Sequence, residues 1–129
     1  MKKLNLIFLA LLLTTTCLAQ LKDFKILADR NPVNYEEGII HDNPPKHLSL
    51  TSNDFNFDVS TLSYISMTIA RGPSLVVDKK FSNYKDFIEF DFETWITENS
   101  EKGDRVVFEF EKSDPINREG SRVIILAIN

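Results

Sequence analysis

The stretch RVVFEFEK, residues 105–112, decides the fold class of this chain of 129 residues. Its apolar side chains alternate with charged ones, and a period of two is typical of a strand with one buried face. After the turn-forming residues 114–120, the sequence is apolar at every position from 123 to 128. We therefore expect a terminal hairpin whose last strand is central in its sheet.

Upstream residues carry the same two-residue rhythm. Alternating apolar side chains occur at Phe55, Phe57 and Val59, at Ile65, Met67 and Ile69, and at Ile88, Phe90 and Phe92, and shorter candidate strands lie at 24–27, 48–50 and 75–77. One segment differs, because Phe92, Trp95 and Ile96 share a helical face within residues 92–99. The pattern predicts an all-β, immunoglobulin-like β-sandwich of about seven strands with at most one short helix. A small β-barrel is the alternative fold.

Residues 1–19 have the pattern of a cleavable bacterial signal peptide. Two lysines precede an apolar run over residues 4–13, which is shorter than the roughly 20 residues that a membrane span needs. Small residues favour cleavage between Ala19 and Gln20, with release into the periplasm or the medium. Cleavage before Cys17, followed by lipidation of this cysteine, is the alternative and would give an outer-membrane lipoprotein.

The remaining residues, 20–129, are predicted to form a single domain with its own core. They carry 13 basic and 19 acidic residues, a net charge of −6, so nucleic acid is an unfavourable partner. The one cysteine precedes them, so no disulfide can stabilise the domain. They contain no apolar run long enough for a transmembrane helix.

Two patterns suggest a metal site and fall short of one. Asp54, Asn56 and Asp58 copy the opening of a calcium loop, but the glycine and the bidentate glutamate that such a loop requires are missing. His41 and His47 lie in a proline-rich loop without a cysteine or a further histidine pair to complete a zinc shell. We therefore expect no metal site.

Catalytic patterns are equally incomplete. Two carboxylate rows are expected, Glu89 with Asp91 and Glu109 with Glu111. Paired acids can hydrolyse glycosides, but alternation with apolar residues assigns these rows to an exposed face, where nothing raises the pKa of an acid. Ser49 and Ser74 lack the context of an activated nucleophile, and Gly72 with Pro73 forms a hairpin corner rather than a phosphate-binding loop. We expect neither a catalytic residue nor a cofactor.

One basic cluster stands out in the acidic domain. Lys79, Lys80 and Lys85 interleave with Phe81 and Tyr84. A charged strand edge that resists pairing with other strands explains such a cluster. A contact patch for an acidic partner is the second interpretation.

Four features follow one another along residues 54–129. They are the aromatic strand at 54–59, the strand and turn at 65–72, the strand entry Gly103-Asp104-Arg105-Val106-Val107-Phe108, and the closing hairpin of Arg118-Glu119-Gly120 with 123–128. In this order they resemble the C-terminal domain family of GldM, the periplasmic arm of the gliding and type IX secretion motor of Bacteroidota. The resemblance implies a β-sandwich that makes protein contacts in a Gram-negative periplasm, without enzyme activity or a cofactor. Motor proteins of this kind begin with a membrane helix and carry several periplasmic domains, whereas this sequence has a cleavable signal and room for one domain.

The sequence therefore favours an exported, non-enzymatic interaction domain with a protein partner in the cell envelope and an accessory role in gliding or type IX secretion. A small exported ligand-binding or inhibitory sandwich that uses the loop residues 31–47 is the alternative. A deep pocket lined by Tyr35, Tyr64 or Trp95 would favour it. A hydrolase that uses the acidic rows ranks last.

Overall fold

The computed structural model describes residues 24–52, 58–112 and 121–129, which form two antiparallel sheets and two α-helices. In chain order the elements are β1 (Phe24–Ala28), β2 (Asn31–Pro32), β3 (Leu48–Ser52), the 3-10 turn η1 (Val59–Thr61), β4 (Leu62–Arg71), β5 (Ser74–Phe81), α2 (Tyr84–Glu89), α3 (Phe92–Asn99), β6 (Arg105–Lys112) and β7 (Ser121–Ala127). The strand orders are β2-β1-β3 and β5-β4-β6-β7. The described strands close into no barrel, and the predicted β-sandwich is confirmed. Neither helix among these residues is long and apolar enough to span a membrane.

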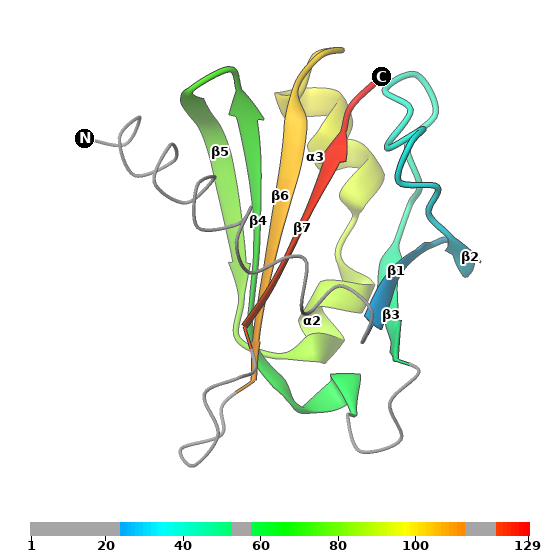
Figure 1. Ribbon diagram of the computed structural model, residues 1–129, viewed down its shortest axis with the longest axis vertical. Helices are drawn as coiled ribbons and strands as arrows, with labels where there is room; N and C mark the ends of the chain where they lie inside the picture. The colour runs from blue at the N-terminus through cyan, green and yellow to red at the C-terminus, as the bar shows by residue number, and fades with distance from the viewer. Residues whose placement is uncertain (1–23, 53–57, 113–120) are drawn as a thin grey trace.

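The core lies on one side of the four-stranded sheet. Alternate residues of the sheet are buried there, namely Ile65, Met67 and Ile69 of β4, Val106, Phe108 and Phe110 of β6, and Ile124 and Leu126 of β7. Helices α2 and α3 lie on this side, next to the three-stranded sheet (Figure 1). The ring of Phe87 meets Phe110 edge to face at a centroid distance of 6.0 Å, and Phe92 lies 6.4 Å from Phe108. These buried rings pack together with the aliphatic side chains of the core, and their burial stabilises the domain.

The prediction of a strand over residues 88–92 is wrong, because this segment holds the end of α2, a two-residue linker and the first residue of α3. The side chain of Asn83 accepts a hydrogen bond from the backbone N–H three residues later, and Asp91 does the same. These two N-caps begin α2 and α3. Helix α3 has the predicted bounds, and α2 exceeds the single helix that was expected. Ile88 and Phe90 are half-buried against the core rather than alternating along a strand.

The last strand is also not central as predicted. Strand β7 lies at the sheet edge, where β6 is the one named strand that pairs with it, so that β4 and β6 are the central strands. Apolar residues on its outer side, such as Ile125 with 39% exposure, made it look buried on two faces. Val59 lies in η1 instead of a strand, while Phe55, Phe57 and the turn at 114–120 lie outside the described residues. The predicted corner at 72–73 is confirmed as the turn between β4 and β5.

A loop segment continues the sheet beyond the end of β7. Ile39 donates its N–H to the carbonyl of Ala127 and accepts from the N–H of Asn129, and His41 donates its N–H to the carbonyl of Asn129, each at 2.8 Å. Gly38 comes just before this pairing with a φ of +71°. Its lack of a side chain lets the loop approach β7 closely.

We predict that Gly38→Ala lowers the free energy of unfolding by about 2–4 kcal/mol, since it combines left-handed strain with a collision. A Cβ here would strike the carbonyl oxygen of Ala127 and lie 3.0 Å from its carbonyl carbon. Gly72→Ala is the matched control, because Gly72 has a φ of +57° but no atom within 4 Å of the added carbon. Urea unfolding of both variants measures the difference. Equal losses would show that the contact with β7 is not close.

Candidate functional site

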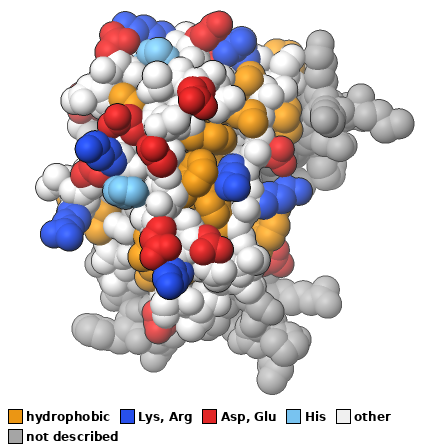
Figure 2. Space-filling view, turned by 180° about the vertical axis from the view of Figure 1, so that it is seen from behind, with side chains coloured by type: hydrophobic (Ala, Val, Ile, Leu, Met, Phe, Trp, Pro, Cys, Tyr) orange, Lys and Arg blue, Asp and Glu red, His pale blue; other side chains and the backbone are white. Residues whose placement is uncertain are grey.

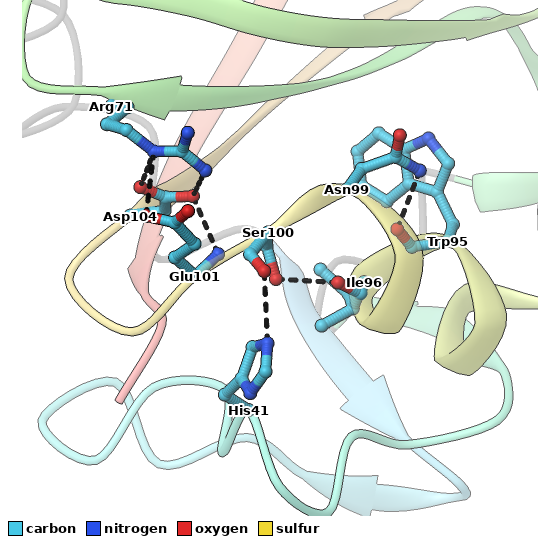
Figure 3. A network of polar contacts seen from close by, with 8 residues as sticks. All are labelled: His41, Arg71, Trp95, Ile96, Asn99, Ser100, Glu101 and Asp104. Atoms are coloured by element: carbon cyan, nitrogen blue, oxygen red, sulfur yellow. Dashed lines mark hydrogen bonds and ion pairs between the residues drawn. The ribbon is translucent and has the colours of Figure 1, made fainter.

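A polar network joins the end of β4, the end of α3 and the start of β6 (Figure 3). Arg71 donates two hydrogen bonds of 2.9 Å to the carboxylate of Asp104, whose side chain is only 2% exposed. The backbone N–H of Glu101 donates a third bond of 2.9 Å to the same carboxylate. These donors, Arg71 above all, hold the pKa of Asp104 below its usual value. Asp104 is therefore ionised at neutral pH and fixed by its neighbours.

His41 connects the neighbouring loop to the end of α3. Its Nε2 donates to the backbone carbonyl of Ser100 at 3.0 Å, since a carbonyl can only accept. Its Nδ1 lies 3.3 Å from the carboxylate of Asp42, and a hydrogen bond from Lys102 is the main reason that the pKa of Asp42 is lowered. The hydroxyl of Ser100 donates to the carbonyl of Ile96 at 2.7 Å. His41 and Ser100 thus bind backbone carbonyls and not each other, so they do not form a pair of general base and serine nucleophile.

The network fixes the turn between α3 and β6. The N–H of Ile128 donates to the carbonyl of Asp104, and the N–H of Gly103 donates to the carbonyl of Ile128, each at 2.8 Å. The turn is thereby tied to the end of β7 as well as to β4. We interpret the network as a support for the turn between α3 and β6.

We predict that Asp104→Asn costs about 2–3 kcal/mol of stability at neutral pH, because it breaks an ion pair with one buried partner. A lowered carboxyl pKa stabilises the fold above the unfolded value of about 4, and this contribution disappears as the pH falls below it. The variant should therefore lose less stability on acidification than the parent chain. Glu101→Gln is the control, since Glu101 lies 3.5 Å from Arg71 but is 70% exposed. Urea unfolding between neutral and acidic pH checks this, and parallel pH profiles of parent and variant would contradict it.

The two predicted carboxylate rows do not come together. Glu109 and Glu111 lie on the outer face of β6, where Glu109 is less exposed than expected, and burial and the charge of Glu111 raise its pKa. Glu89 is the last residue of α2, and Asp91 caps α3 on the opposite side of the sheet. Hydrogen bonds from Thr94 lower the pKa of Asp91. A catalytic pair needs two carboxylates at one substrate. The sheet separates Glu109 and Glu111 from Glu89 and Asp91, so the two rows cannot form such a pair.

The candidate metal ligands have structural roles. His47 donates from Nδ1 to the carbonyl of Phe90 at 3.1 Å and so joins β3 to the α2–α3 linker. Asp58 caps η1, whereas Asp54 and Asn56 lie outside the described residues. Within the described ranges, no three His, Cys, Asp or Glu side chains converge as metal ligands.

Three open hollows in the described surface have volumes of about 270, 400 and 330 Å³. None of these three is lined by Tyr35, Tyr64 or Trp95, the residues expected of a deep pocket. The second hollow brings Ser49 and His47 to one wall. No hydrogen bond joins these two side chains, so the hollow lacks an activated nucleophile.

Sheet edges remain as places where the backbone can bind a partner. The edge of β3 is closed by a side chain from α2. The Tyr84 hydroxyl accepts a hydrogen bond of 3.0 Å from the N–H of Leu50 and donates one of 3.3 Å to its carbonyl. This hydroxyl therefore occupies the groups that an added strand would use. On the other side of the same sheet, β2 is only two residues long and ends in Pro32, which has no N–H to donate.

Lys79, Lys80 and Phe81 of the predicted basic cluster lie on β5, an edge of the larger sheet (Figure 1), and Tyr84 and Lys85 lie at the start of α2. Phe81 is buried and Tyr84 is half-buried, so these two aromatic rings belong to the core. Lys79, Lys80 and Lys85 are exposed. A partner at this place would meet three lysines and the backbone of β5 instead of aromatic faces.

We predict that Tyr84→Phe destabilises the domain by about 1–2 kcal/mol, because two polar groups of Leu50 lose their partner. Tyr35→Phe serves as the control, since Tyr35 is 45% exposed, and it should change the unfolding free energy by less than about 0.5 kcal/mol. Thermal unfolding of the two variants provides the comparison. If both variants unfold alike, the hydroxyl does not close the edge.

Comparisons with protein-family models, with curated proteins and with solved structures find no match for this chain. Sequence reasoning did not find the Arg71–Asp104 pair or the Tyr84–Leu50 contact. Each joins residues more than 30 positions apart, and no local pattern signals such a pair.

Proposed function

We propose that this chain is an exported, non-enzymatic domain that binds another protein of the cell envelope. The proposal is based on the polar groups in the described interior and turns, which are already engaged in hydrogen bonds or ion pairs within the fold. Asp104, Ser100 and the two histidines each bind the backbone or an ion-pair partner. A domain of this kind acts through its surface.

The described surface supports this proposal. Seen from behind Figure 1, hydrophobic side chains gather in the middle of the face and are bordered by charged groups of both signs (Figure 2). Patches with an apolar centre and a polar rim are typical of protein contacts. The resemblance of residues 54–129 to the GldM C-terminal domain family makes gliding and type IX secretion proteins the first partners to test.

We predict that the exported chain begins at Gln20, after signal peptidase has removed residues 1–19. Mass spectrometry of the intact protein from the envelope fraction measures this directly. A mass that corresponds to a lipidated Cys17 would support the outer-membrane alternative. A full-length chain found in the cytoplasm would contradict export.

We further predict that chemical cross-linking in the native host, followed by purification from the envelope, joins the chain to one defined protein. Glu109→Gln tests the hydrolase alternative in parallel, since this carboxyl has the raised pKa that a catalytic acid needs. The variant should keep the cross-link, and neither form should cleave envelope glycans. Recovery of no defined protein in repeated experiments, or glycan cleavage that the variant abolishes, would contradict the proposal.

A further inference from the structure

Strand β5 is a long sheet edge that no described group closes. Antiparallel strands direct alternate backbone groups to opposite sides, and β5 pairs with β4 on one side only. Elsewhere the Tyr84 hydroxyl binds Leu50 at the edge of β3, residues 39–41 pair with the chain from Ala127 onward at the end of β7, and β2 is only two residues long. The backbone of β5 is therefore available to an added strand.

The geometry of β5 restricts such a strand to one end. The pairing of β4 with β5 is interrupted by a bulge between Ile69 and Ala70, opposite Leu75 and Val77. From Val77 to Phe81 the register is continuous. A bulge twists an edge away from regular pairing, so an incoming strand would meet residues 77–81.

The charge at this end is positive on the two faces of the strand. Lys79 lies over the rings of Phe81 and Phe90, with its ammonium 5.6 Å from each centroid. Lys80 is 63% exposed, and its ammonium lies 4.0 Å from the carboxylate of Asp78. An exposed ion pair at this distance contributes little to stability, so Asp78 does not cancel the charge of Lys80. The domain as a whole has a net charge of −6. This local reversal of sign favours an acidic ligand.

We propose that an extended acidic segment of the protein partner adds to the edge of β5 as a fifth strand, with its carboxylates beside Lys79 and Lys80. This inference rests on the proposed function and gives the chemistry of the partner. Backbone hydrogen bonds along 77–81 supply the attachment, and the lysines select the charge of the segment.

A second copy of the chain fits this edge less well. Two β5 strands from two copies could pair antiparallel and form one continuous sheet with the same outer face. The two-fold symmetry of this pairing then places one residue of β5 opposite the same residue of the other copy, at the centre of the pairing. A centre at Asp78 or Lys80 places like charges directly opposite, which is unfavourable. A centre at Lys79 places two lysines opposite each other and pairs each Asp78 with Lys80 of the other copy. An acidic partner avoids this repulsion.

The test is the binding of a synthetic peptide of about seven residues, a usual strand length, in which glutamate alternates with valine. Nuclear magnetic resonance titration of the purified chain locates the site, and calorimetry measures the affinity. Shifts should concentrate on residues 77–81. The same peptide with alternate backbone amides methylated, and a peptide with lysine in place of glutamate, should each bind at least about tenfold more weakly.

Matched variants separate charge from folding. Lys80→Glu should weaken binding about tenfold, whereas Lys25→Glu, an equal charge change at an exposed position of β1, should change it less than twofold. Asp78→Asn should tighten binding about two- to threefold, since it removes a repelling carboxylate, and a gain cannot come from misfolding. Circular dichroism confirms that each variant is folded.

Several results would overturn the inference. These are undiminished binding of the methylated peptide, shifts that lie away from β5, an absence of binding at millimolar peptide, or dimers of the chain that pair through β5. If the Lys80→Glu variant still cross-links to the same envelope protein, binding at the β5 edge is refuted and the proposed function stays intact. Loss of every envelope partner would refute the function itself.

Discussion

The inner face of β4 and β6 is the constraint on which the rest of the structure depends. Phe108 and Phe110 on one strand and Ile65, Met67 and Ile69 on the next are almost completely buried. Exposure of such a surface to water would cost roughly 1.5–3 kcal/mol for each large side chain. Two short helices and a three-stranded sheet cover it together. The phenylalanine side chains of α2 and α3 are the contacts that hold this cover in place.

This cover also determines which sheet edges stay open. When Phe87 packs against Phe110, α2 brings Tyr84 to the edge of β3, and the hydroxyl binds Leu50. The same arrangement leaves β5 beyond the helices, at the far edge of the larger sheet. Core packing and the proposed docking edge are thus two results of one arrangement.

Local sequence patterns predicted those helices and strands that are determined by residues close together in the sequence. Strand β6 and helix α3 were predicted from alternation and from the 3.6-residue period of Phe92, Trp95 and Ile96. The segment before α3 was misread because Ile88, Phe90 and Phe92 also alternate. The N-caps Asn83 and Asp91 carried the correct signal.

Contacts between distant residues were beyond such reasoning. The position of β7 at an edge depends on which strands pair, and its apolar outer residues suggested two buried faces. Arg71 and Asp104 come together only after the sheet has formed. The candidate site was therefore predictable as a basic cluster, but its aromatic members turned out to belong to the core, and its open backbone became visible only in the topology.

Hydrogen exchange of the chain without any partner tests the central claim, that its own groups close the edge of β3 at Leu50 and the end of β7 and leave β5 open. The account predicts slow exchange of the amides of Leu50, Ile39 and Asn129, which donate to Tyr84, Ala127 and Ile39. It predicts that alternate amides of β5, those directed away from β4, exchange faster by orders of magnitude. Uniform protection along β5, or rapid exchange at Leu50, would contradict it.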